Sequence, residues 1–450
     1  MGSIKAHLTS DKLIGRTMKS AATVSAAQLF SNALRLLSNL VLVRLVAPEA
    51  FGLMAIAMTI NQAAVMFADI GISQSVIRSE RGREPAFIGT AFISNVVLFF
   101  SLCLIVTAIS LIMAATRESF PTDSIYSSVQ AAPLIAFASL QLAVQGMISP
   151  KVWIARRELS LWRPTLIDTG AQLIGVICTL TLAWAGLGVW SLAIGSLVTI
   201  SVGTALGHVL LTGPQVPLVW ERSSFNEILQ FGKWLIPASI AGFLINRGDR
   251  LLVGLWLGAT QFSIYVIAAL WFEVVNSIVQ RANASVSLSS LSEALRTSKE
   301  FASQFYQKAR LISDAVCLCS FLGFNLIIQP LTDLLYPDVY APAVGFARLL
   351  SVGLLALPLQ LTHWVVLSSG DSRSFAFVLW GSSAALFASA VVLEDQLGVQ
   401  AAILAFAMRP LFIAPVSLMV ASKVININPL TELRTVFMVF IGTAAVLIAN

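Results

Sequence analysis

The sequence predicts an all-α integral membrane protein that crosses the bilayer many times. Three observations support this prediction: the composition, the lengths of the apolar runs and the distribution of basic residues. Of the 450 residues, 57% are hydrophobic and 11% are charged, and the mean hydropathy is +0.85. Such values exclude an ordinary soluble globular protein as well as a disordered chain.

Apolar runs long enough to cross a bilayer recur along nearly the whole chain, because about 20 apolar residues suffice for one helical span. The first run is too long for a signal-peptide core, so we interpret it as a true span. The longest connection, about 284–310, is too short for a soluble catalytic domain. We expect thirteen spans, at approximately 21–47, 51–77, 86–115, 128–149, 164–185, 187–212, 231–257, 260–283, 311–334, 342–368, 374–393, 398–422 and 435–450. Since the last run stops at Asn450 without a flanking charge, a fourteenth span is left open.

The basic residues indicate the orientation of these spans. With the amino terminus in the cytoplasm, most of the 28 Lys and Arg residues fall in inside segments, and the outside loops hold only Arg117. This asymmetry is the positive-inside rule. It explains the net charge of +6 without any binding of nucleic acid.

No metal or other cofactor is expected. The four cysteines, Cys103, Cys178, Cys317 and Cys319, all lie within apolar runs, where they are interpreted as small buried hydrophobic residues. The three histidines show no spacing typical of metal ligands.

An internal repeat predicts how the spans are grouped. Residues 44–57 align with residues 255–268 at an offset of 211, so that Phe51 meets Phe262. The match places the first helix pair on the seventh and eighth helices, and an even number of intervening helices gives parallel repeats. We therefore expect two six-helix bundles, 1–213 and 214–425, arranged as a V-shaped alternating-access transporter, with one or two additional C-terminal helices from 426–450 onward.

Four arginines lie deep within predicted spans: Arg35, Arg247, Arg250 and Arg409. Inserting an arginine at the centre of a membrane helix costs about 2.5–3.5 kcal/mol, so such residues usually face a wet cavity and contact an anion. Arg409 precedes Pro410, which permits a kink beside the charge. The deep charges indicate an anionic ligand.

The arginines of the first and seventh helices occupy related positions. Arg247 and Arg250 are three residues apart and share one helix face, on which Asn246 lies one turn before Arg250. At the repeat offset, Arg35 falls on Asn246 and Asn39 falls on Arg250. The basic residues within the predicted spans are arginine and never lysine. This choice favours planar bidentate recognition of phosphate or carboxylate. For Arg44 and Arg348, near the edges of their spans, snorkelling to the interface is the better interpretation.

Two deep carboxylates admit alternative roles. Asp249 either takes part in ion coupling or pairs Arg247 or Arg250 structurally. Glu273 is either a proton or sodium site or the partner of one of the deep arginines. Asp314 lies near the inside end of its span, where solvation at the interface is the simpler interpretation.

Two segments near the amino terminus and one in the seventh helix show a family resemblance. Leu36–Leu53 and Phe67–Ile77 resemble the amino-terminal signature of Wzx-type bacterial polysaccharide flippases, and Asn246–Gly258 is similar to their seventh-helix pattern. These flippases form the polysaccharide transporter family of the MOP exporter superfamily.

The resemblance implies translocation of an undecaprenyl-diphosphate-linked oligosaccharide from the inner to the outer leaflet of the bacterial plasma membrane, during exopolysaccharide, capsule or lipopolysaccharide biosynthesis. It also implies that Arg35, Arg247, Arg250 and Arg409, with Asn39 and Asn246, hold the diphosphate. The expected partners are this lipid-linked cargo, membrane lipids, and a polysaccharide polymerase with its export machinery.

Two other function classes fit a polytopic membrane protein. A cation-coupled drug extruder of the same superfamily is expected to have a cavity lined by carboxylates, whereas the deep charges here are net positive. A membrane-embedded glycan polymerase or ligase is expected to carry a sizeable outside loop with catalytic residues, whereas the outside loops here are short and almost free of charge. We therefore expect a transporter and not an enzyme.

Overall fold

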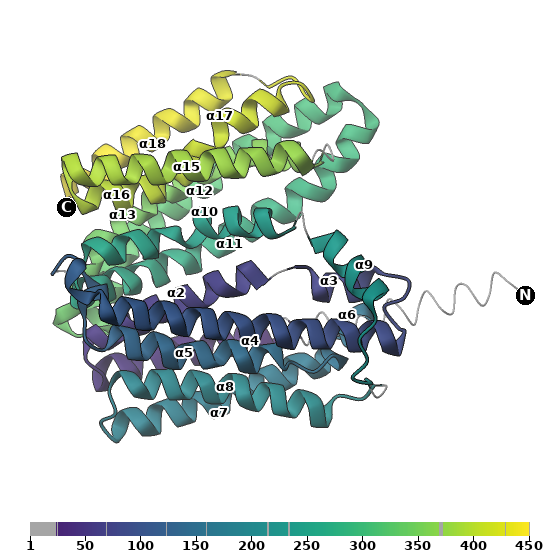
Figure 1. Cartoon of the computed structure of the whole chain (residues 1–450). Coiled ribbons are helices and arrows are strands. Elements are labelled where there is room, and N and C mark those ends of the chain that lie inside the picture. Colours follow the sequence, from purple (N-terminus) through teal and green to yellow (C-terminus); the bar gives the residue numbers. More distant parts are fainter. Residues whose placement is uncertain are drawn as a thin grey trace, which may run out of the picture. The chain divides into compact units, whose positions relative to one another are not determined.

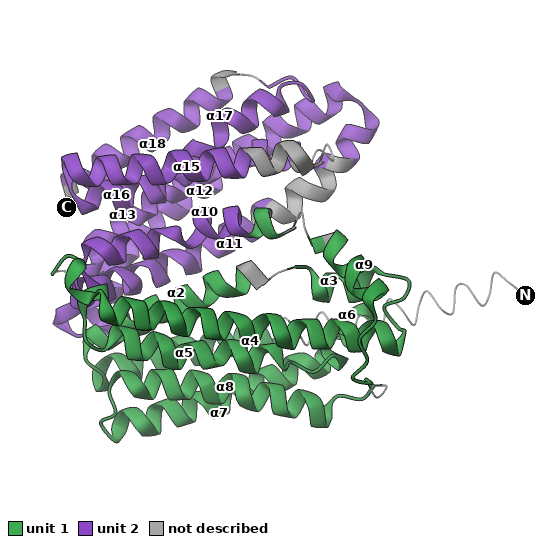
Figure 2. Ribbon diagram, viewed as in Figure 1, with its two compact units in different colours: residues 1–122, 126–239 green, residues 123–125, 240–450 purple. Residues whose placement is uncertain are grey.

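The structure is a computed structural model. It describes residues 24, 26–68, 70–122, 124–158, 160–213, 216–232, 235–368, 372–427 and 429–449. Within these residues every regular element is a helix, which confirms the predicted all-α class (Figure 1). The chain divides into two compact units, 1–122 with 126–239 (unit 1) and 123–125 with 240–450 (unit 2) (Figure 2). The boundaries expected at 213 and 425 stay predictions.

Unit 1 consists mainly of antiparallel helix hairpins. Gly175 and Gly195 let two of its helices, α7 (Trp162–Trp184) and α8 (Val189–Leu210), approach closely, because an added Cβ at either position would collide with a threonine of the opposite helix. The expected second span bends at Gly71, whose φ of 69° lies in the left-handed region that favours glycine. The helices are Ala26–Leu45, α2 Pro48–Ala68, α3 Ile72–Arg78, α4 Pro85–Ala115, α5 Ala131–Gly146, α6 Lys151–Arg157, α7 Trp162–Trp184, α8 Val189–Leu210 and α9 Arg222–Gly232.

Unit 2 contains the two longest helices, which meet at Ser298. The Ser298 side chain caps the second of them by accepting from the backbone N–H of Phe301. The segment expected as the longest loop, 284–310, is therefore almost wholly helical, because this cap replaces the loop. The helices are α10 Leu235–Trp256, which belongs to unit 2 from Ile240 onward, α11 Ala259–Thr297, α12 Lys299–Leu335, α13 Ala343–Ala356, α14 Gln360–Ser368, α15 Ser372–Leu397, α16 Val399–Ala407, α17 Arg409–Ala421 and α18 Pro429–Ala449.

The helices agree with the predicted spans in their order along the chain. Among the described residues, 10 helices are long and apolar enough to cross a membrane, and the number rises to 12 if two bent pairs each count as one span. Helix α10 corresponds to the seventh predicted span, but it carries three charged residues, Arg247, Asp249 and Arg250. It is therefore too polar to be counted among these 10 helices. The bend of 43° between α16 and α17 lies beside Pro410, as the sequence predicts.

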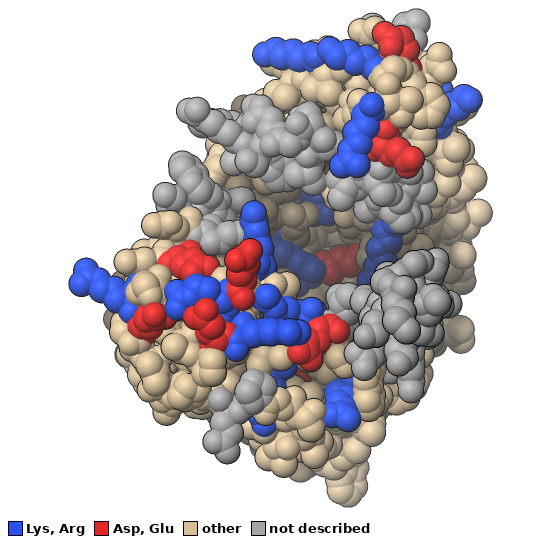
Figure 3. Space-filling view, turned by 90° about the vertical axis from the view of Figure 1, so that its right-hand side faces the viewer, with Lys and Arg blue, Asp and Glu red and all other residues tan. Residues whose placement is uncertain are grey.

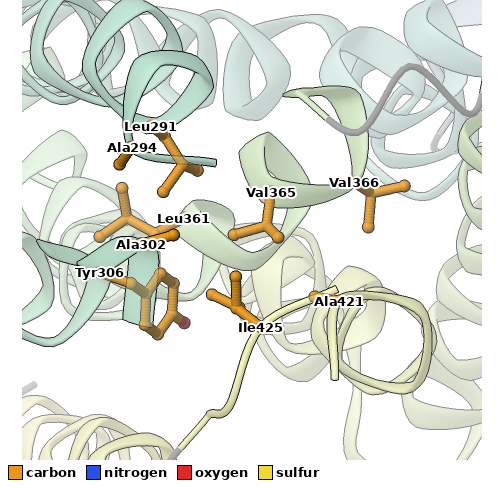
Figure 4. Close-up of a cluster of buried hydrophobic side chains, with 9 residues drawn as sticks. All are labelled: Leu291, Ala294, Ala302, Tyr306, Leu361, Val365, Val366, Ala421 and Ile425. Carbon is orange, nitrogen blue, oxygen red and sulfur yellow. The ribbon is translucent and has the colours of Figure 1, made fainter. Parts of the chain in front are cut away.

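A buried apolar cluster joins the ends of four helices of unit 2. Figure 4 shows the ring of Tyr306, from α12, beside Ile425, which follows α17. Clusters of this kind stabilise the bundle by dispersion contacts in a close-packed interior. Its members are Leu291, Ala294, Ala302, Tyr306, Leu361, Val365, Val366, Ala421 and Ile425.

Basic and acidic side chains alternate over the end of unit 1 that bears α3, α6 and α9 (Figure 3). There Arg81 pairs with Glu84 at 2.9 Å and with Glu221 at 2.8 Å. The second pair links the loop before α4 to the start of α9, and Ser224 also donates a hydrogen bond to Glu221.

This contact predicts a dependence of stability on pH. Hydrogen bonds from Ser224 and Arg81 lower the pKa of Glu221 from 4.5 to about 2. Because the folded pKa lies below the unfolded value, the stabilisation is present above about pH 4.5 and is lost as the pH falls towards 2. We expect Glu221→Gln to lower the melting temperature slightly at pH 6 and to have no effect near pH 2, as measured on detergent-solubilised protein. An equal effect at both pH values would contradict this prediction.

Candidate functional site

Helices α10 and α11 form an antiparallel pair that brings two arginines to one carboxylate. Arg247 and Arg250, one turn apart on α10, both donate to Oε1 of Glu273 on α11, and the Arg250 Nη2 to Oε1 distance is 2.8 Å. The side chain of Arg247 is 29% exposed, that of Arg250 is 16% exposed and that of Glu273 is 35% exposed. The structure has the ion pair that was one alternative for Glu273, and the role as a proton or sodium site stays a prediction.

Of the two alternatives for Asp249, the structure does not have the pairing with an arginine among the residues it describes, and the role in ion coupling stays a prediction. The hydroxyl of Tyr265, a fully buried residue of α11, donates to Oδ2 of Asp249. The physical reason is helix periodicity: neighbouring positions such as 249 and 250 do not face the same side of a helix, so Glu273 receives both arginines and Asp249 is turned towards Tyr265.

The bend between α16 and α17 brings Arg409 to the same cluster. Its Nη1 donates to the backbone carbonyl of Asn246 at 3.5 Å, a long hydrogen bond. Within the described residues no carboxylate lies within 4.0 Å of this guanidinium, so most of its five donors are available to a ligand.

Arg247, Asp249, Tyr265, Glu273 and Arg409 line one cavity of about 300 Å³ within unit 2, and Arg250 adjoins it through its ion pair with Glu273. Three guanidinium groups and two carboxylates contribute to its wall or adjoin it, which leaves one excess positive charge if all are ionised. Asn276 and Gln280 of α11 add amides to the wall. An anion with several oxygen atoms, such as a phosphate, fits this arrangement because planar guanidinium groups bind it bidentately.

Gly248 explains how the charged stretch of α10 packs. A Cβ at this position would collide with the ring of Phe387 on α15. Glycine therefore allows α15 to approach α10 closely on the side away from the paired arginines.

The predicted site residues of the first helix lie in unit 1. Arg35 is exposed and donates to Oδ1 of Asn32 at 3.4 Å, and Asn39 is half-buried. Their equivalence to Asn246 and Arg250 stays a prediction.

Sequence reasoning missed a second charged group in unit 2. Asp314 is 4% exposed and not solvated at an interface: it contacts Arg310 at 3.2 Å and also accepts from Arg434 and Thr435 of α18. Arg310, fully buried, pairs in turn with Glu432 at 2.9 Å. The spacing of Arg310 and Asp314, four residues apart on one helix, was the available signal.

Comparison with known protein families gives one match to most of the chain. The family model described as polysaccharide biosynthesis protein matches residues 41–345. These residues include the whole charged stretch of α10 and also Glu273.

Two curated proteins are similar in sequence. The succinoglycan biosynthesis transport protein ExoT of Rhizobium meliloti (strain 1021) is 22% identical over 326 residues, which cover 70% of this chain and 62% of that protein. The lipopolysaccharide biosynthesis protein WzxC of Escherichia coli (strain K12) is 25% identical over 249 residues, covering 54% and 48%. The matched part of this chain thus spans less than two thirds of each relative.

A solved structure has a similar fold. The inward closed conformation of the lipid II flippase MurJ matches with a TM-score of 0.67 and 14% identity, covering 93% of this chain and 91% of that one. At this identity the likeness concerns the fold alone. The apolar helices and the two relatives in sequence imply a multi-pass membrane protein.

Proposed function

Because the chain belongs to the polysaccharide biosynthesis protein family, we propose that it moves a lipid-linked oligosaccharide across the plasma membrane. The cargo is an undecaprenyl-diphosphate-linked glycan that passes from the inner to the outer leaflet. The protein acts as a transporter and not as an enzyme, in the bacterial inner membrane with its amino terminus in the cytoplasm. A polysaccharide polymerase and export machinery would receive the cargo.

One observation carries this proposal: among the described residues the guanidinium of Arg409 has no carboxylate within 4.0 Å, and it lines a cavity whose Glu273 pairs with two further arginines. The Glu273 carboxylate lies between the guanidinium groups of Arg247 and Arg250, where an oxygen atom of a phosphate would also bind. A diphosphate brings several such oxygens and competes with Glu273 for Arg247 and Arg250, while Arg409 binds it without giving up an ion pair.

The same balance of charge separates this function from its nearest rival. A cation-coupled drug extruder would bind a cationic molecule, which an excess of positive charge in the cavity repels. A phosphate-bearing lipid is attracted by it. Asp249 and Glu273 limit the excess, and Glu273 is proposed to pair with Arg247 and Arg250 when no cargo is bound.

Deletion of the encoding gene tests the proposal. We expect the deletion strain to lose surface or secreted polysaccharide and to accumulate a polyprenyl-diphosphate-linked oligosaccharide on the cytoplasmic side. Mass spectrometry of extracted lipids measures the accumulated species and also identifies the glycan. A plasmid copy of the wild-type gene is the matched control.

Unchanged export in the deletion strain, with no accumulated lipid-linked glycan, would contradict the proposed function. Loss of a lipid-linked precursor on purified protein, with formation of a longer glycan, would instead favour a polymerase.

A further inference from the structure

A second cavity lies wholly within unit 1, among the first described helix and α5 to α8. Its volume is about 630 Å³, which falls within the roughly 300–1,000 Å³ typical of sites for small molecules. Its wall is rich in amide and hydroxyl side chains: Gln141 and Gln145 from α5, Gln172 from α7, and Ser196, Thr199 and Thr204 from α8.

Some of these polar groups are satisfied by the protein and one is not. Gln141 donates to the Ser196 hydroxyl at 2.9 Å, and Gln172 donates to the carbonyl of Ser31 at 3.0 Å. In the part of the chain that the structure describes, the side-chain amide of Gln145 has no hydrogen-bond partner. Polar groups inside a membrane protein are retained where they line a wet cavity or meet a ligand, so Gln145 offers both a donor and an acceptor to an occupant.

The charges and the apolar parts of the wall narrow the class of ligand. Arg35 and Arg156 are partly balanced by Asp168, so the cavity is only weakly cationic and neither a bare anion nor a bare cation is strongly favoured. Ile167 and Ile200 add apolar surface. A sugar ring matches this mixture, because its hydroxyls both donate and accept hydrogen bonds while its C–H faces pack on apolar side chains.

A glycine keeps the cavity open. Gly203 of α8 lines it, and a Cβ added there would have only the Cβ of Ala171 within 4 Å, at the ordinary contact distance of 3.5 Å. A small addition therefore fits without strain, whereas a longer side chain would fill the space that a ligand needs.

We propose that this cavity of unit 1 is a sugar-binding site that takes a hexose unit, with Gln145, Gln172 and Arg35 bonding to its hydroxyls. The inference rests on the proposed function only for the source of the sugar, which is the glycan of the lipid-linked cargo. Recognition of one sugar unit by fixed amides would give the transporter selectivity among glycans that share the same diphosphate.

Binding of simple sugars tests the site without any transport. The probes are the methyl glycosides of glucose, galactose, mannose and N-acetylglucosamine, each added to purified full-length protein in nanodiscs and observed by saturation-transfer NMR. We expect transfer to at least one glycoside, loss of transfer in Gly203→Leu, and affinity about fivefold weaker in Gln145→Leu, as one lost hydrogen bond predicts.

Two further variants serve as controls. Gly170→Leu adds the same side chain to α7 at a place with nothing within 4 Å and outside the cavity wall, so binding should match the wild type. Arg348→Ala, in unit 2 and outside both cavity walls, should also bind normally. No transfer to any of the four glycosides, or unchanged transfer in both Gly203→Leu and Gln145→Leu, would overturn the inference.

The outcomes separate the two proposals. Sugar binding that depends on the cavity, in a protein whose deletion causes no lipid-linked glycan to accumulate, would sink the proposed transport and leave the sugar site standing. Accumulation without sugar binding would do the reverse.

Discussion

Replacing Arg409 with alanine is expected to lower transport by about 10- to 100-fold without lowering the melting temperature. A hydrogen bond to a charged group contributes about 1.5–3 kcal/mol, which corresponds to this loss of cargo binding. Stability should be kept because no carboxylate of the described chain pairs with Arg409, so its removal leaves no buried charge unpaired. Export of polysaccharide and accumulation of the lipid-linked intermediate, at matched amounts of protein, measure the effect.

Arg348→Ala is the matched control. Arg348 also lies within a predicted span of unit 2, but it donates to Gln329 at 2.9 Å and does not line the cavity of 300 Å³. We expect near-normal export from this variant. A loss of export in Arg409→Ala that only follows a loss of folded protein would argue against a role in binding the cargo.

Replacing Glu432 with leucine is expected to destabilise unit 2 by about 3–5 kcal/mol, the usual cost of breaking a buried ion pair. Glu432 accepts from Arg310 and from the Tyr306 hydroxyl, and all three side chains are buried. Without Glu432, the Arg310 guanidinium keeps only its contact with Asp314, which also pairs with Arg434. The contacts between α12 and α18 are weakened as a result. Unfolding by a graded increase in denaturing detergent measures the change.

A double variant separates the ion pair from simple loss of packing. Arg310→Met and Glu432→Leu together remove both charges and leave Arg434 and Asp314 as a neutral pair. The double variant should therefore be more stable than the sum of the two single effects predicts. Strict additivity would show that the pair contributes nothing as a pair.

The charged cluster of α10 shows what kinds of contact sequence reasoning can and cannot supply. The common face of Arg247 and Arg250 and the kink beside Arg409 followed from residue spacing. The structure places Arg247 and Arg409 in the wall of one cavity, and Arg250 contacts Glu273 of the same wall. The sequence did not show that Glu273, and not Asp249, is the carboxylate that pairs with these arginines. Helix periodicity alone already indicates that Asp249 does not face the same side of α10 as Arg250.

The buried group around Arg310 was harder to predict. Arg310 ends the connection expected at 284–310, where a charge beside an apolar run usually meets water. Its partner Glu432 lies 122 residues away in sequence. No local sequence pattern predicts that α18 packs against the face of α12 that carries Arg310.

The sequence by itself determined the all-α class and the order of the spans along the chain. These properties depend on the transfer of each segment from water to hydrocarbon, which adds up locally along the chain. Only the tertiary structure decided that Glu273 bridges two arginines, that Asp249 meets Tyr265 and that Arg310 is buried against Glu432. Ion pairs and hydrogen bonds act over a few ångströms, so they depend on how helices distant in sequence rotate and pack against one another.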